Sequence, residues 1–134
     1  MRQYVTDTQC LLWYLADDRR LPRAPGRIFN AADNGSAQIL VPTIVLVESI
    51  FLAQRRRVGS DTLARMLELR EDLDDGIAVV PLDMAIVRTV MDFGPAAVPE
   101  LADRVIAATA RSLGLPLLTV DHAIAASGLV EVIS

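Results

Sequence analysis

Four acidic residues, far apart along the chain, have the types and positions needed for joint chemistry: Asp7, Glu48, Asp103 and Asp121. Asp7 directly follows a short segment rich in Tyr, Val and Thr, which predicts a strand. Asp121 directly follows a second predicted strand. Because the carboxyl ends of parallel strands meet at one edge of a sheet, where ligands collect, we expect both aspartates at that edge.

The other two acids lie on predicted helices that could flank this edge. Asp103 stands near the start of the helix predicted for residues 99–113, and Glu48 lies inside the almost wholly apolar segment 44–52. Burying a glutamate alone is costly, so Glu48 must reach solvent, a partner or a metal ion. Together the four side chains predict a carboxylate cluster.

Each acid also has a simpler interpretation when it is taken alone. Asp7 could cap the first helix, and Asp121 could be a turn residue. Asp103 could complement a helix dipole or pair with Arg104, and Glu48 could belong to the polar face of an amphipathic helix. The sequence leaves these alternatives open, and only the complete set favours a shared site.

A cluster of four carboxylates cannot stay ionised unless a cation neutralises it. All 13 basic residues are arginine and none is lysine, so a divalent metal is the natural candidate. Oxygen ligands suit Mg²⁺ or Mn²⁺ better than zinc. Such a metal activates water and offsets charge on a phosphate, which predicts phosphodiester hydrolysis. Glu48, Asp103 or Asp121 could instead orient the attacking water.

Composition excludes several other classes of protein. Without lysine there is no P-loop lysine, no Schiff base and no phosphoaspartate receiver. A phosphatase of the haloacid-dehalogenase type needs a second aspartate two residues after the first, where this chain has Gln9. One cysteine and one histidine are too few for a structural zinc site. The net charge of −4 argues weakly against nucleic acid, but arginines cluster at 19–27 and 55–57.

Length and hydropathy predict one domain that covers residues 1–134. The hydrophobic fraction of 52% is high, so some apolar surface should remain for another chain to cover. The apolar stretch 39–47 is far too short to span a membrane, and Asp7 interrupts any signal-peptide core. We therefore expect no membrane segment and a cytoplasmic location.

Predicted strands and helices alternate along the chain. The strands cover residues 2–6, 38–41, 77–81, 117–120 and 129–133, and the helices cover 25–34, 43–57, 60–73, 83–91 and 99–113. Another helix follows Thr8, which we predict as its cap, with support of the acidic site as the alternative. This alternation predicts a three-layer α/β/α sandwich around a short parallel sheet.

The sequence resembles the PIN-domain family over nearly its whole length, and within it the VapC-type ribonuclease toxins of bacterial toxin–antitoxin pairs. The similarity rests on segments 5–15, 41–48, 99–110 and 117–121, whose order and spacing fit the family.

This resemblance implies a PIN-like fold and a Mg²⁺- or Mn²⁺-dependent endoribonuclease that cuts RNA and leaves 5′-phosphate and 3′-hydroxyl ends. Asp7 and Asp103 would be the main metal ligands, and Glu48 and Asp121 would complete the acidic site. Thr119 would support the site by hydrogen bonding. The resemblance also implies inhibition by a cognate antitoxin and formation of a homodimer.

Other residues carry both a structural and a functional interpretation. Trp13 and Tyr14 either pack in the core or stack on bases. The arginine run 55–57 either ends a helix in solvent or follows a phosphate backbone. Arg104 is either solvated or in contact with the substrate phosphate, and His122 is predicted as a helix-start or loop residue rather than a general base.

Two rival functions remain beside the toxin. The first is a non-catalytic α/β interaction module, and the second is a PIN-like nuclease that belongs to no toxin–antitoxin pair. The complete set of acids argues against the first, because an idle module has no need for Glu48 in an apolar run.

Overall fold

Five parallel strands form the central sheet of the computed structural model, which describes all residues, 1–134. The strands are β1 (Arg2–Thr6), β2 (Ala37–Pro42), β3 (Ile77–Val80), β4 (Leu117–Leu118) and β5 (Val132–Ile133). Their order across the sheet is β3-β2-β1-β4-β5. The chain thus builds outward from β1 to β3 and then returns to the other side of β1. This reversal leaves a crevice beyond the carboxyl ends of β1 and β4, which is where ligands bind in open α/β sheets.

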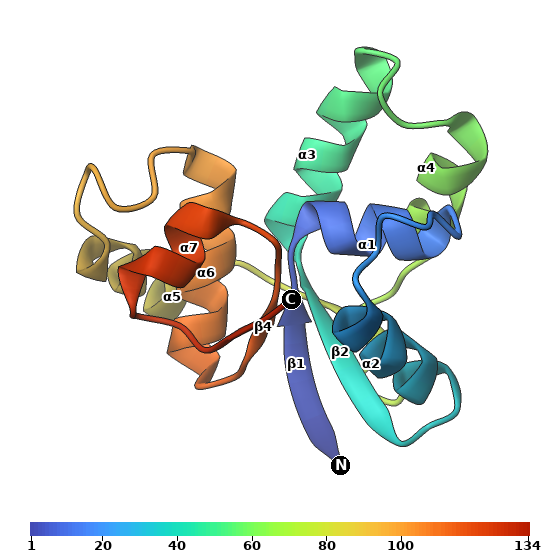
Figure 1. Cartoon of the computed structure of the whole chain (residues 1–134), viewed down its shortest axis with the longest axis horizontal. Helices are drawn as coiled ribbons and strands as arrows, with labels where there is room; N and C mark the ends of the chain where they lie inside the picture. The colour runs from blue at the N-terminus through green and yellow to red at the C-terminus, as the bar shows by residue number, and fades with distance from the viewer.

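Helices cover both faces of the sheet and extend past its carboxyl edge. They are α1 (Thr8–Leu15), α2 (Arg23–Asp33), α3 (Thr43–Gln54), α4 (Ser60–Leu67), α5 (Met84–Thr89), the 3₁₀ turn η1 (Val90–Asp92), α6 (Leu101–Leu113) and α7 (His122–Ser127). Figure 1 shows α5, α6 and α7 on one side of the sheet and α2 on the other, with α3 and α4 projecting beyond the strand ends. The predicted three-layer α/β/α sandwich is confirmed.

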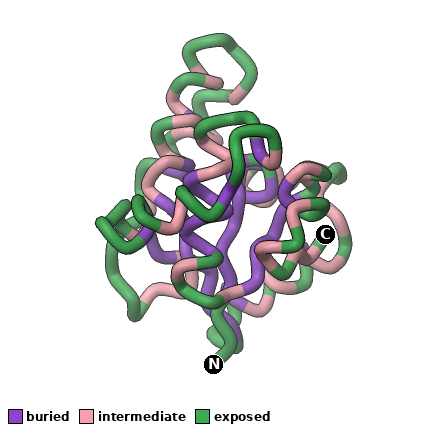
Figure 2. The backbone as a smooth tube through the Cα atoms, turned by 90° about the vertical axis from the view of Figure 1, so that its left-hand side faces the viewer, coloured by how far each residue is buried: buried purple, intermediate pink, exposed green.

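The core lies along the middle strands. All residues of β2 are buried, as expected for a strand covered on both faces, and its neighbour β1 is buried from Tyr4 onward. Figure 2 shows this buried centre and the exposed connection between α3 and α4 at the far end of the molecule. None of the helices combines the length and the apolar character that crossing a membrane requires.

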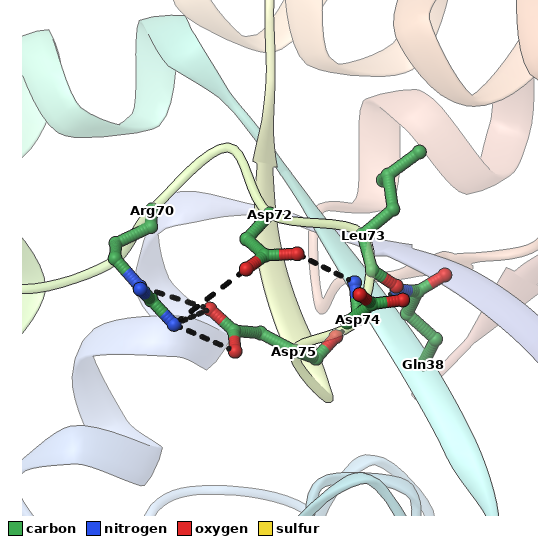
Figure 3. Close-up of polar contacts among 6 residues, drawn as sticks. All are labelled: Gln38, Arg70, Asp72, Leu73, Asp74 and Asp75. Atoms are coloured by element: carbon green, nitrogen blue, oxygen red, sulfur yellow. Dashed lines mark hydrogen bonds and ion pairs between the residues drawn. The ribbon is translucent and has the colours of Figure 1, made fainter.

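The loop before β3 holds a second group of acids, at the opposite edge of the sheet from the four predicted site residues. In this loop Arg70 donates to both carboxylate oxygens of Asp75, at 3.0 and 3.1 Å. The side-chain amide of Gln38 donates to the backbone carbonyls of Leu73 and Asp75, at 2.7 and 3.0 Å (Figure 3). The carboxylates of Asp72 and Asp75 therefore help to fix the loop that leads into β3, while that of Asp74 makes no such contact.

Several predicted elements differ from the structure in length. The helix expected over 60–73 ends at Leu67, because the chain then turns and Arg70 forms a bridge with Ala78 of β3. The helix expected over 43–57 ends at Gln54, and the one expected over 83–91 passes into the turn η1 after Thr89. The strands expected over 117–120 and 129–133 are reduced to Leu117–Leu118 and Val132–Ile133. No helix was predicted after Asp121, where α7 begins; its first residue is His122, in agreement with the helix-start interpretation.

Candidate active site

The four predicted acids line one cavity of about 260 Å³ at the carboxyl edge of the sheet. We call it the acidic pocket, and its lining is Asp7, Thr8, Gln9, Glu48, Leu52, Asp103, Val120 and Asp121. The acids come from the ends of β1 and β4 and from α3 and α6. Gln9, Leu52 and Val120 were not among the predicted site residues. Only their nearness to the predicted acids along the chain could have indicated them.

Asp7 is oriented in this pocket by two hydrogen bonds. It caps α1 by accepting a hydrogen bond from the backbone N–H of Cys10 at 2.8 Å, so the capping interpretation is confirmed and is compatible with a place in the pocket. Its other carboxylate oxygen accepts from the Thr119 hydroxyl at 2.6 Å. That hydroxyl in turn accepts from the backbone N–H of Asp121 at 3.0 Å. Thr119 therefore ties together the two strand ends that carry the aspartates.

Glu48 points from α3 toward α1 and accepts a hydrogen bond from the Thr8 hydroxyl. The prediction that Thr8 caps α1 is wrong, because the preceding Asp7 takes that position. The Thr8 hydroxyl is thereby free to orient Glu48. This bond explains how a carboxylate can occupy an otherwise apolar run without being left unpaired.

Asp103 and Asp121 both line the pocket, close enough for the charge of Asp121 to act on Asp103. Asp121 caps α7 by accepting from the backbone N–H of Ile124 at 2.9 Å. Burial first, and then the negative charges of Asp121 and Glu48, raise the pKa of Asp103 to about 7. Burial also raises the pKa of Asp7, and the hydrogen bonds from Thr119 and Cys10 oppose that rise. No basic side chain contributes to either pKa shift.

The donor set fits a hard divalent cation. The pocket offers four carboxylates and the Thr8 hydroxyl, and no Arg or His side chain lines it. All-oxygen ligands of this kind suit Mg²⁺ or Mn²⁺. The side chains as they stand do not form a closed coordination sphere, since no three acidic, Cys or His side chains are close enough together to hold one ion. Binding would therefore draw the carboxylates inward from these positions.

Arg104 and the arginine run 55–57 lie outside the acidic pocket. Arg104 donates to the backbone carbonyls of Val98 and Pro95, so it fastens the loop before α6 and does not reach into the pocket. Its suggested contact with a substrate phosphate finds no support in this arrangement. The run 55–57 follows α3, and Arg57 lies in a neighbouring hollow.

The family model of the PIN domain matches residues 4–127, a span that includes all four acids. The chain belongs to the PIN-domain family. The family resemblance inferred from the sequence is thus confirmed, and it places the protein among nucleases that act on nucleic acid. No curated protein sequence matches this PIN domain.

Several solved structures are similar to this PIN domain. The DNA-bound VapBC complex from Salmonella typhimurium matches with a TM-score of 0.71 and 19% identity, over 99% of this chain and 98% of that chain. The toxin VapC20 of Mycobacterium tuberculosis, described as cleaving the sarcin–ricin loop, matches with a TM-score of 0.68 and 18% identity, over 98% and 99%. FitAcB from Neisseria gonorrhoeae matches with a TM-score of 0.63 and 14% identity, over 98% and 96%. At these identities the likeness shows a shared fold.

Proposed function

We propose that this PIN domain is a metal-dependent endoribonuclease and the toxin of a toxin–antitoxin pair. One observation carries the proposal: four carboxylates from distant parts of the chain line a single cavity at the carboxyl edge of the sheet. Such a cavity provides oxygen ligands for a divalent cation and no other strong catalytic group. Hydrolysis of a phosphodiester is the reaction that this set of residues supports best.

The roles of the acids follow from their surroundings. Asp7 and Asp103 would hold Mg²⁺ or Mn²⁺, with Glu48 and Asp121 completing the site. When bound, the metal supplies activation of water and neutralisation of charge on the phosphate. The chain's own part is to fix these ligands, because Asp7 is oriented by Thr119. The raised pKa of Asp103 also lets that carboxyl hold a proton near neutral pH while no cation is present.

The partners we propose are an RNA substrate, a cognate antitoxin and a second copy of the chain, all in the cytoplasm. Large apolar side chains remain exposed, among them Phe51 on α3, Met91 in η1 and Leu101 on α6. A monomer leaves such side chains in water, and a protein partner would cover them. The fold is shared with a toxin–antitoxin complex from Klebsiella pneumoniae, at 19% identity, which supports the toxin as the working hypothesis.

The decisive experiment compares the wild type with Asp7→Asn on a panel of structured RNAs, with Mn²⁺ and with EDTA. We expect cleavage by the wild type with Mn²⁺ only, and a loss of at least about a hundredfold in Asp7→Asn because the buried metal ligand loses its charge. Asp74→Asn is the matched control, since it removes one acid from the loop at the opposite edge of the sheet. Equal cleavage by wild type and Asp7→Asn, or cleavage that EDTA leaves unchanged, would contradict the metal mechanism.

Growth after induction of the protein alone tests the toxin role separately. We expect arrest with the wild type and with Asp74→Asn, and normal growth with Asp103→Ala. RNA cleavage in vitro without any arrest would indicate a PIN nuclease outside a toxin–antitoxin pair. Neither cleavage nor arrest would indicate the non-catalytic interaction module.

A further inference from the structure

A second hollow, of about 310 Å³, adjoins the acidic pocket. We call it the arginine pocket, and its lining includes Gln9, Trp13, Arg20, Leu52, Arg57 and Thr62. Gln9 and Leu52 line both hollows. The two hollows are therefore neighbours, close enough for one strand of nucleic acid to occupy both.

The backbone around this pocket adopts an unusual conformation at two places. Asp17 (φ 52°) and Arg56 (φ 58°) are the only residues other than glycine in the left-handed region. They follow the last turns of α1 and α3, where glycine is the usual choice because a side chain is strained there. Each is succeeded by a residue that lines the arginine pocket, Asp18 or Arg57. The strained turns thus place side chains around one hollow, as expected of a functional site.

Hydrogen bonds fix both turns in the same way. The backbone N–H of Asp18 donates to the carbonyl of Trp13 at 2.8 Å, and that of Arg57 donates to the carbonyl of Leu52 at 2.9 Å. Arg57 lines the pocket while its neighbours Arg55 and Arg56 do not. The structure thereby distinguishes one member of the arginine run from the other two.

The charged and aromatic groups of the pocket are suited to a nucleotide. Arg57 forms no ion pair with any carboxylate, so its guanidinium is free to bind a phosphate. Arg20 lies over the Trp13 ring at 5.7 Å from its centroid and is held there by Asp18 at 2.8 Å. An arginine over an indole face presents a planar cation beside which a base can stack.

Trp13 also has an unsatisfied hydrogen-bond donor. Its indole Nε1 is the only buried side-chain nitrogen or oxygen in the chain without a partner. Buried polar atoms in proteins almost always have a partner, and the ring that carries this atom lines the arginine pocket. Oxygen and nitrogen atoms on the edges of nucleobases are acceptors that could supply the missing partner.

We propose that the arginine pocket binds the nucleotide next to the phosphodiester that the acidic pocket cleaves, in single-stranded RNA. Arg57 binds the phosphate, and the base lies against Arg20 and Trp13. Gln9, which lines both hollows, reaches the ribose or the base between them. This inference rests on the proposed function for the identity of the ligand. Its geometry is independent of the metal site.

The single tryptophan makes the pocket directly observable. Trp13 gives one indole N–H signal in a ¹H–¹⁵N spectrum, and nucleoside 5′-monophosphates contain no phosphodiester that the protein could cut. We expect these mononucleotides to shift the indole signal in a saturable way, and inorganic phosphate to shift it much less. Arg57→Gln should weaken the apparent affinity by about tenfold, because a charge-assisted contact to phosphate is lost. Arg55→Gln, from the same run but outside the pocket, should bind like the wild type.

Kinetics of RNA cleavage provide the second measurement. We expect Arg57→Gln to raise KM for a single-stranded RNA by about tenfold with little change in kcat. The slope of log binding constant against log salt concentration should become less steep, by the amount expected for the loss of about one phosphate contact. Arg55→Gln should behave like the wild type.

The outcomes separate this inference from the proposed function. An indole signal that shifts with nucleotides while no RNA is cut would support the pocket and contradict the nuclease. The opposite result is metal-dependent cleavage with an indole signal that nucleotides do not shift and with equal KM in the two arginine variants. It would overturn the proposed nucleotide site and leave the proposed nuclease function intact. That second result is also the one expected if the hollow receives side chains of a protein partner instead.

Discussion

At the scale of single residues, the chemistry of this PIN domain depends on how each carboxylate is solvated and paired. Asp103 has a pKa of about 7, well above its ordinary value, so the folded chain holds this proton more tightly than the unfolded chain does. Between about pH 4 and pH 7 the folded state binds more protons, and stability therefore falls as pH rises through this window. Above it, the ionised group is a repulsive neighbour of Asp121 and Glu48.

Replacing Asp103 by asparagine tests whether ionisation of this carboxyl lowers the stability of the fold as pH rises. In EDTA we expect Asp103→Asn to increase the free energy of unfolding by ~1–2 kcal/mol at about pH 8. This value is smaller than the free energy that corresponds to the whole pKa shift of Asp103, because solvent screens a half-exposed side chain. At about pH 5 the effect should nearly vanish, since the aspartic acid is then protonated. Urea denaturation at both pH values measures it. Asp74→Asn is the control, and an equal gain at both pH values would contradict the pKa assignment.

Thr119 is the residue on which the geometry of the acids depends most. Thr119→Val removes the donor to Asp7 and the acceptor for the backbone N–H of Asp121, with little change in shape. We expect a loss of ~2–3 kcal/mol in unfolding free energy, because two buried polar groups lose their partner. Thr109→Val is the matched control, since that buried hydroxyl only donates to a carbonyl in its own helix. If both variants lose the same stability, Thr119 has no special role at the site.

At the scale of elements, the ends of α1 and α3 shape the molecule next to the acidic pocket. The left-handed residue after α3 is Arg56, in a position where glycine is unstrained. We expect Arg56→Gly to stabilise the fold by ~0.5–1 kcal/mol. Arg55→Gly should destabilise it, because Arg55 has a negative φ at the end of the helix. Thermal unfolding of the two variants measures the difference. If Arg56→Gly is less stable than the wild type, the Arg56 side chain makes a contact that stabilises the fold by more than its left-handed backbone conformation costs.

At the scale of the whole molecule, the acidic pocket gathers side chains from elements that are far apart along the chain. Its acids come from β1, α3, α6 and the end of β4, so a cation bound there would link both halves of the molecule. We expect Mg²⁺ at about a hundred times its dissociation constant to raise the free energy of unfolding by ~2–3 kcal/mol, because only the folded state assembles the ligands. Asp7→Asn should lose most of this gain. A melting temperature that Mg²⁺ and EDTA leave equal would contradict a metal site in this pocket.

Much of the architecture followed from local patterns in the sequence. Short β-branched segments that alternate with helical periodicity predicted the parallel sheet and its flanking helices, because each pattern allows its apolar side chains only one way to be buried. The limits of the elements were less predictable. Leu69 and Leu73 continue the helical spacing past Leu67, but the bridge between Arg70 and Ala78 competes with the helix, and such a long-range contact leaves no local signal.

From the pattern of elements alone one could predict that the four acids meet at one end of the sheet, because each stands at a definite place relative to a strand end or a flanking helix. The folded chain was needed to learn which hydroxyl orients which carboxylate. It was also needed to learn that Arg104 fastens a loop and that Arg57, unlike Arg55, lines the neighbouring hollow. Those facts depend on side-chain directions and on two turns with left-handed residues. Both arise when distant segments pack against each other, and neither is encoded in the spacing of residues along the chain.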